Sequence, residues 1–216
     1  MGPRKADQPA LSRDEIVSAA ITIVDRDGLE NLSMRRLAKD LGTSTMSLYY
    51  HVPDKSALYD LILDAVMDEV DLSIDDPSQS TTERVVTAAY ALRAALLAHP
   101  NSMPIVLSRS LRTRAQLRPV EAMAGILFEA GVTPTEAITV VDVIGQYVYG
   151  TTAAHATHLA DGEYHDDVRE ADFTEATSED FPNMARIVAE STYIGFEKEF
   201  DVGLRILASG LLVAYE

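Results

Sequence analysis

Apolar residues recur at helical spacing along most of the chain. Ile16, Ala19, Ala20, Ile23 and Val24 fall on one face of a helix over about 12–27. The same spacing predicts further helices near 34–41, 45–51, 55–70, 81–98, 118–130, 134–157, 182–193 and 195–214, and a broken piece from 102 to 112. The sequence contains neither the strict alternation of strands nor an internal repeat. We therefore expect an all-α protein.

Residues 33 to 59 predict two short helices joined by a tight turn. Ser33 is a good N-cap for an apolar stripe of Met34, Leu37, Ala38 and Leu41. Gly42 falls where the first helix must stop, and Thr43 or Ser44 can cap the second helix. Pro53 ends the second helix, and Asp54 can cap the next. This helix-turn-helix pattern fits a helix into the DNA major groove, although an ordinary helical hairpin in a core has the same pattern.

The string Leu48-Tyr49-Tyr50-His51 follows a helix that ends in leucine-glycine, and Lys55 and an apolar helix come next. This arrangement resembles the DNA-binding domain of TetR-family transcriptional regulators, over about residues 12 to 70. A looser resemblance continues through LLAHPN (Leu96 to Asn101) and the C-terminal FEKEFDVGLRILASGL. It implies an all-α fold with an N-terminal three-helix DNA-binding domain and a C-terminal helical domain for ligand binding and dimerisation. The expected divisions are a mobile arm (1–11), the helix-turn-helix domain (12–58), a connecting helix and linker (59–79), and the C-terminal domain (80–216).

The resemblance also implies which side chains contact operator DNA. They are Arg35, Thr45, Met46, Ser47, Tyr49, Tyr50, His51 and Lys55. The start of the recognition helix adds Thr43 and Ser44, because helix N-termini point at the groove. Arg35 is the best candidate for a base contact, since arginine pairs bidentately with guanine. Tyr49, Tyr50, His51 and Lys55 would mostly contact phosphates, although the Tyr49 ring could instead pack in the core, as Leu48 should.

The formal net charge of −16 is unfavourable for a DNA-binding protein. However, residues 1 to 55 hold eight basic and eight acidic residues, so the whole net charge falls on the rest of the chain. Salt confines each field to about a Debye length, so a locally basic face can still bind DNA. The charge argues only against loose coating of DNA.

The second half of the chain supplies apolar side chains, and a few side chains that end in a polar group, for a ligand pocket between helices. The residues proposed to line it are Leu92, Met103, Val106, Leu107, Leu111, Met123, Leu127, Phe128, Gln146, Tyr147, Tyr149 and His155. Methionines and tyrosines at such spacing are also ordinary core residues. The group as a whole therefore carries the prediction.

Tetracycline repressors proper hold magnesium-tetracycline with a histidine after their LLAHPN-like string and with a glutamate late in their long helix. When the two sequences are aligned on these segments, Val106 and Ala154 stand at those two positions. Ala88, Leu92 and Met123 likewise replace polar or aromatic contacts. We expect no metal or cofactor, and a small apolar or amphipathic effector. A metal site remains an alternative, since His155 and His158 are three residues apart and His165 lies in the acidic stretch Asp161 to Asp180. A solvated loop is the simpler interpretation of that stretch.

The last predicted helix is apolar on two sides. One stripe comprises Phe196, Phe200, Leu204, Leu207 and Leu211; the other comprises Val202, Ile206, Ser209, Gly210 and Val213. A helix buried on two sides can face its own core and a partner. Gly203, Ser209 and Gly210 would permit close helix approach. With the apolar helix 134–157, the last helix predicts a two-fold four-helix interface, as in relatives.

We therefore expect a homodimeric repressor that binds a palindromic operator and is released by its effector. An α-helical small-molecule-binding protein or enzyme with a purely structural N-terminal hairpin is the alternative, and an activator on the same fold cannot be separated from a repressor. No phosphate-binding glycine loop, nucleophile elbow or metalloprotease motif points to an enzyme. The chain has no cysteine, signal-peptide pattern or apolar run of transmembrane length, so a cytoplasmic location without membrane contact is expected.

Overall fold

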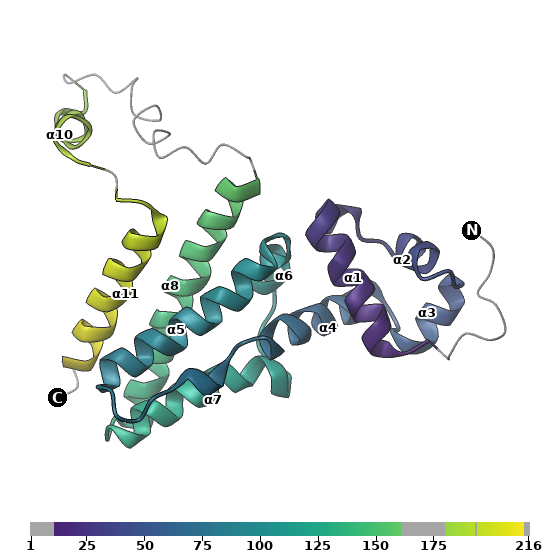
Figure 1. Ribbon diagram of the computed structural model, residues 1–216, viewed down its shortest axis with the longest axis horizontal. Helices are drawn as coiled ribbons and strands as arrows, with labels where there is room; N and C mark the ends of the chain where they lie inside the picture. Colours follow the sequence, from purple (N-terminus) through teal and green to yellow (C-terminus); the bar gives the residue numbers. More distant parts are fainter. Residues whose placement is uncertain (1–10, 161–179, 193, 214–216) are drawn as a thin grey trace.

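The computed structural model describes residues 11–160, 180–192 and 194–213, all of them in helices or connections without a strand (Figure 1). The helices are α1 (Arg13–Asp27), α2 (Met34–Asp40), α3 (Thr45–His51), α4 (Lys55–Asp68), α5 (Thr81–Ala98), α6 (Met103–Ser108), α7 (Arg114–Glu129), α8 (Pro134–Ala160), α10 (Pro182–Glu190) and α11 (Phe196–Val213). Short 3₁₀ turns cover Leu29–Asn31, Leu72–Ile74 and Pro100–Ser102. The all-α prediction is confirmed. Within this described part, no helix is long and apolar enough to span a membrane.

Side-chain caps define the starts of α1, α2, α3, α4, α5 and α7. Ser12 and Glu15 form a capping box at α1, and the hydroxyls of Ser33 and Ser44 accept N–H bonds at α2 and α3. Gly42, with φ +63°, makes the turn between α2 and α3. These local signals explain why the helix-turn-helix follows its predicted boundaries.

The start of α7 was predicted at 118, which is wrong by four residues. Thr113 caps the helix, and Gln116 closes a capping box with it, so α7 begins at Arg114. Pro119 then lies inside α7 instead of at its start. Proline has no N–H to donate to the carbonyl of Ala115, so α7 lacks one helical hydrogen bond in its second turn.

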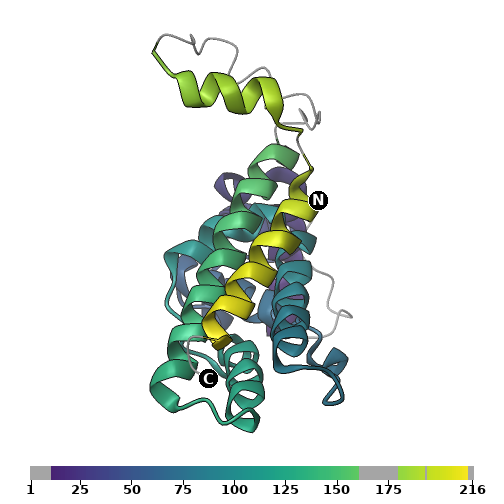
Figure 2. The same ribbon diagram turned by 90° about the vertical axis from the view of Figure 1, so that its left-hand side faces the viewer.

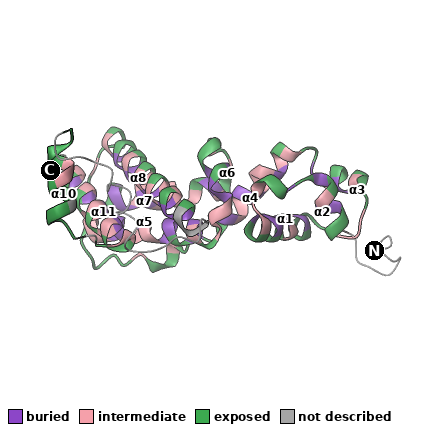
Figure 3. Cartoon of the chain, turned by 90° about the horizontal axis from the view of Figure 1, so that it is seen from above, coloured by how far each residue is buried: buried purple, intermediate pink, exposed green. Residues whose placement is uncertain are grey.

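The helices form a head and a body. Figure 1 shows α1, α2 and α3 gathered at one end and α4 extending from them into α5, α7, α8 and α11. Figure 2 shows α11 lying alongside α8. In Figure 3, buried residues continue along α4 from the head into the body. One hydrophobic cluster therefore runs through both parts.

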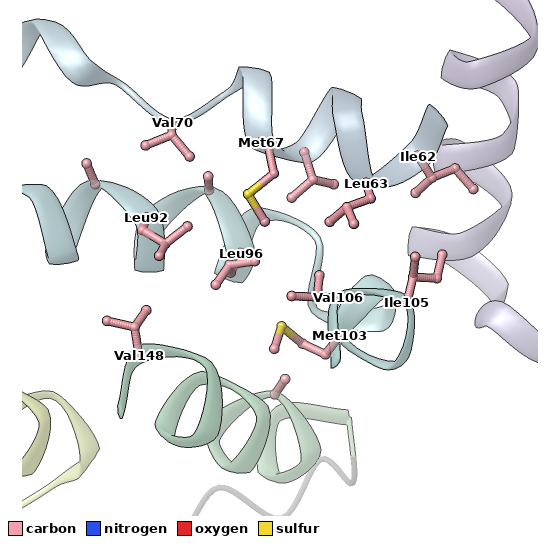
Figure 4. Close-up of a cluster of buried hydrophobic side chains, with 14 of the residues drawn as sticks. Ile62, Leu63, Met67, Val70, Leu92, Leu96, Met103, Ile105, Val106 and Val148 are labelled. Carbon is pink, nitrogen blue, oxygen red and sulfur yellow. The ribbon is translucent and has the colours of Figure 1, made fainter. Parts of the chain in front are cut away.

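The middle of this cluster is where α4 meets the LLAHPN region. Leu63 and Met67 of α4 lie beside Leu96, Val106 and Met103 (Figure 4). A close-packed core transmits displacement, because its side chains have few alternative arrangements. The packing therefore makes α4 a stiff connection between head and body.

Polar contacts also join α4 to α7 and to the segment before it. Asp60 pairs with Arg109, and Asp68 pairs with Arg118 at 3.0 Å. Between them, Asp64 accepts a 2.6 Å hydrogen bond from the Gln116 amide. The three aspartates are four residues apart, so they lie on one face of α4.

Candidate nucleic-acid interface and ligand cavity

Helix α3 is anchored by one side chain and presents its others to solvent. Leu48 is fully buried, whereas Met46 is 78% and Tyr50 89% exposed. Large exposed side chains on a short helix are unusual for a core hairpin and typical of a binding face. Tyr49 is 45% exposed, so its ring is not part of the core.

The other proposed DNA contacts lie around α3. Ser44 caps it, and the Ser44 hydroxyl lies 2.9 Å from that of Ser47. Thr43, Thr45 and His51 are partly exposed. The Lys55 ammonium lies 5.3 Å from the centre of the Tyr59 ring, a cation–π contact that orients it. The structure thus gathers the proposed contacts at the α2–α3 end of the molecule.

The two arginines of α2 have different partners. Arg36 forms an ion pair with Asp27, which also accepts a 2.7 Å bond from Arg26. Arg35 is exposed and forms no ion pair with any described residue. Its guanidinium is therefore available to a ligand, whereas that of Arg36 is used within the head.

The body contains a cavity between α5, α7 and α8. About 700 Å³ within it is free of protein atoms, a volume that includes open solvent, and the centres of water-sized spheres can occupy about 120 Å³. A concave, mostly apolar space between helices is a usual place for a small molecule. Its wall comprises Leu72, Ala88, Ala89, Leu92, Leu111, Gln116, Pro119, Val120, Met123, Val141, Asp142, Ile144, Gly145, Gln146 and Tyr149. Burial raises the pKa of the Tyr149 hydroxyl, which therefore stays a hydrogen-bond donor at neutral pH.

Five of the proposed ligand residues line this cavity together: Leu92, Leu111, Met123, Gln146 and Tyr149. The others lie elsewhere. Met103, Val106 and Leu127 are buried in the core, while Leu107 and Phe128 are more than half exposed. Ala88, which the string matching singled out, is a wall residue, but Val106 and Ala154 are not.

Tyr147 and His155 point to α11 instead. The Tyr147 hydroxyl donates to the carbonyl of Phe200 at 3.1 Å, and the ring stacks on that of Phe200. A Cβ added at Gly203 would lie 2.1 Å from the same hydroxyl. Gly203 therefore makes room for Tyr147 of its own chain, where the sequence suggested approach of a partner.

His155 belongs to a buried polar cluster. Its Nδ1 lies 3.0 Å from Arg93, which pairs with Glu197 through two short bonds. The hydrogen bonds from Arg93 lower the pKa of Glu197. Among the described residues, no group of three potential ligands could hold a metal. The His158 side chain and His165 lie outside the described residues, as does nearly all of the acidic stretch.

Sequence reasoning missed Gln116, Pro119, Val120, Asp142 and Gly145 as wall residues. Gln146 and Asp142 are one helical turn apart, and Gln116 and Val120 are likewise one turn apart. Helical period could have added these partners once one member of each pair was placed. The choice of which helix faces meet depends on packing between helices far apart in sequence.

Comparisons with known proteins agree with this arrangement. Residues 16–62 match the family model described as bacterial regulatory proteins, tetR family, and residues 75–215 match the tetracyclin repressor-like C-terminal domain. An HTH-type transcriptional regulator of Saccharopolyspora erythraea is 31% identical over 94% of this chain and 86% of its own length. The HTH-type transcriptional repressor DrrR1 of Streptomyces coeruleorubidus is 30% identical over 98% and 81%.

Solved structures show the same fold. ActR of Streptomyces coelicolor in complex with (S)-DNPA superimposes with a TM-score of 0.83 at 28% identity, covering 96% of this chain and 100% of that one. The ActR complex with actinorhodin gives the same score and identity, covering 96% and 98%. The curated relatives are named as regulators or repressors, and neither family model describes an enzyme.

Proposed function

The chain belongs to the TetR family of bacterial regulatory proteins, and we propose that it is a homodimeric repressor released from a palindromic operator by a small molecule. In this proposal residues 12–58 bind DNA, 59–79 connect, and 80–216 bind the effector and dimerise. The protein would act in the cytoplasm, where its operator DNA is.

The observation that carries the proposal is the connection between the cavity and the head. Gln116 lines the cavity and donates to Asp64 of α4, while α4 packs against α1 of the head. An effector that contacts and displaces Gln116 would move α4 through the hydrogen bond to Asp64. In a dimer, this movement would change the separation of the two α3 helices. Half-site spacing on DNA is strict, so a small change would weaken operator binding.

The relatives support both halves of the proposal. DrrR1 is named as a repressor, and ActR has been solved with actinorhodin and with (S)-DNPA bound. Together with the mostly apolar wall of the cavity, they favour an apolar or amphipathic effector for this chain.

The dimer is proposed from the outer faces of α8 and α11. Ile206 and Val213 are 67% and 68% exposed, and Val202 lies on the same stripe. On α8, Ile138 is half exposed, and the exposed positions that follow include the polar Asp142 and Gln146 and the small Gly150 and Ala154. The exposed apolar stripe of α11, beside this helix, is the surface that we propose a partner covers in a four-helix interface.

Selection of bound fragments from random duplex DNA tests the function. We expect an enriched palindrome whose half-sites lie about one helical turn apart, and an affinity that falls steeply with salt as counterions are released. A selection that enriches no sequence, or an asymmetric single site, would contradict the proposal.

A further inference from the structure

The cavity wall includes an unusually basic stretch of an acidic chain. Residues 108–118 contain four arginines and no carboxylate, whereas the whole sequence has 18 basic and 34 acidic residues. This stretch supplies Leu111 and Gln116 to the wall, at the beginning of α7. The stretch therefore brings positive charge to the segment that forms part of the wall, while Arg109 at its beginning contacts Ser56 and the Tyr59 ring of α4.

Two of the four arginines are neutralised within the protein. Arg109 pairs with Asp60 and Arg118 with Asp68. Arg112 and Arg114 are exposed, and neither forms an ion pair within the described residues. The segment therefore offers two uncompensated positive charges.

Both charges lie close to wall residues along the chain. Arg112 follows the wall residue Leu111, and its backbone N–H donates to the Gln116 side chain at 2.8 Å. Arg114 is the first residue of α7, two residues before Gln116, so both arginines belong to the segment that supplies this part of the wall, while their own side chains are exposed outside it. Asp142 of α8 is the one charged side chain among the described wall residues, and Glu121 of α7 is exposed. Asp64 is occupied by its bonds from Gln116 and Thr113.

We propose that the effector is an amphipathic anion. Its apolar body fills the space between Leu92, Met123 and Tyr149, and its anionic group, a carboxylate or an acid of similar charge, faces Arg112 and Arg114. This inference rests on the proposed function, because it treats the bound molecule as an effector. The charge preference of the cavity can be measured without DNA. It also explains how an anion reaches a cavity in a protein of net charge −16, since the local field and not the total charge steers association.

Two dyes that differ in one charge test the proposal. The probes are 1-anilinonaphthalene-8-sulfonate and the uncharged N-phenyl-1-naphthylamine, whose ring systems are matched. Fluorescence titration of the full chain should show that Arg112→Gln with Arg114→Gln weakens sulfonate binding about five- to tenfold at low salt and leaves the neutral dye unchanged. The difference should shrink as salt is added.

Four further variants assign the effect to this cavity and to charge. Gly145→Leu fills the cavity and should weaken both dyes, Arg112→Lys should keep sulfonate binding, and Asp142→Asn should strengthen it. Arg186→Gln, on α10 away from α7 in Figure 1, should change neither dye. Melting temperatures confirm that each variant is folded.

Three results would overturn the proposal. One is an equal loss of both dyes in the double arginine variant. Another is sulfonate binding that Gly145→Leu does not weaken, because the anion would then bind elsewhere. The third is a loss of operator affinity without loss of sulfonate binding, which would make Arg112 and Arg114 DNA contacts. If no operator is found but the dye preference holds, the proposed function fails and the anion site stands.

Discussion

Arg35 and Arg36 are neighbours on α2 that differ in how free their guanidinium groups are to contact DNA. Arg36 is held by Asp27, while Arg35 extends into solvent with no described ion-pair partner. Arginine that is free to reach a guanine edge supplies sequence preference, whereas a lysine or arginine on phosphate supplies affinity alone.

Arg35→Ala should therefore cost about 1–3 kcal/mol of operator binding and relax the preference at one base pair per half-site. Binding to a panel of single-base operator variants measures both effects. Arg36→Ala is the matched control and should leave the base preference unchanged. If Arg35→Ala weakens every operator variant equally, Arg35 is a phosphate contact.

His99 joins three parts of the molecule at one imidazole. Its Nδ1 lies 2.8 Å from Asp25 of α1 and its Nε2 3.0 Å from Glu69, which follows α4. Asn101 adds hydrogen bonds to the carbonyls of Val24 and Asp25. Only the protonated ring can donate to both carboxylates. Burial lowers the pKa of His99, but the bonds and charges of Asp25 and Glu69 outweigh it, so the pKa lies above its ordinary value of 6.5.

A raised pKa makes the stability contribution of His99 depend on pH in a definite direction. The contribution is fully present below pH 6.5 and is lost as the pH rises through the folded-state pKa. Urea unfolding of the wild type and of His99→Gln should therefore give a free-energy difference that is largest at the acid end and declines toward alkaline pH. A difference that is constant with pH, or that grows with it, would show that the doubly bonded imidazolium does not form.

At the scale of the helices, the sequence predicted where most helices begin, but it did not predict which helix faces pack against one another. Capping residues such as Ser33 and Asp54 act within one turn, so α2, α3 and α4 begin at the predicted residues. Tyr147 and Tyr149 were both assigned to the pocket, although two residues on a helix are about 200° apart and cannot face the same way. The structure turns Tyr149 to the cavity and Tyr147 to Phe200. The cavity itself depends on three helices whose contacts no local pattern specifies.

The two apolar stripes of α11 are likewise distinguished only by packing. Phe200 and Leu204 are buried against the body, while Ile206 and Val213 are exposed. Since the exposed stripe is the one available to a partner, Ile206→Asp should place an unpaired charge in the dimer interface and cost at least about 3 kcal/mol of association.

Sedimentation velocity at micromolar concentration should then show monomers for Ile206→Asp and dimers for the wild type. Ile187→Asp, on the exposed face of α10, is the control and should remain dimeric. Wild-type protein that sediments as a monomer would remove the four-helix interface from the proposal.

For the whole molecule, the question is how an event in the body reaches α3. The cavity has a mostly apolar wall, in which Asp142 is the one carboxylate among the described residues. We therefore expect an effector that needs no divalent ion, and the hydrogen bond from Gln116 to Asp64 links the wall directly to α4.

Effector-induced release of operator DNA should consequently be the same with and without excess EDTA. Gly145→Leu offers the complementary change, because a Cβ at residue 145 meets only the Tyr149 ring, at 3.8 Å, so the added side chain enters the cavity without disturbing α8. This variant should bind the operator as the wild type does but require at least about tenfold more effector for release, since it removes apolar volume from the site. Gly125→Leu adds the same side chain to α7 outside the cavity wall and should respond normally. Release that EDTA abolishes would mean that a metal takes part, and the metal-free cavity would have to be abandoned. Release unaffected by Gly145→Leu would instead place the effector elsewhere in the body.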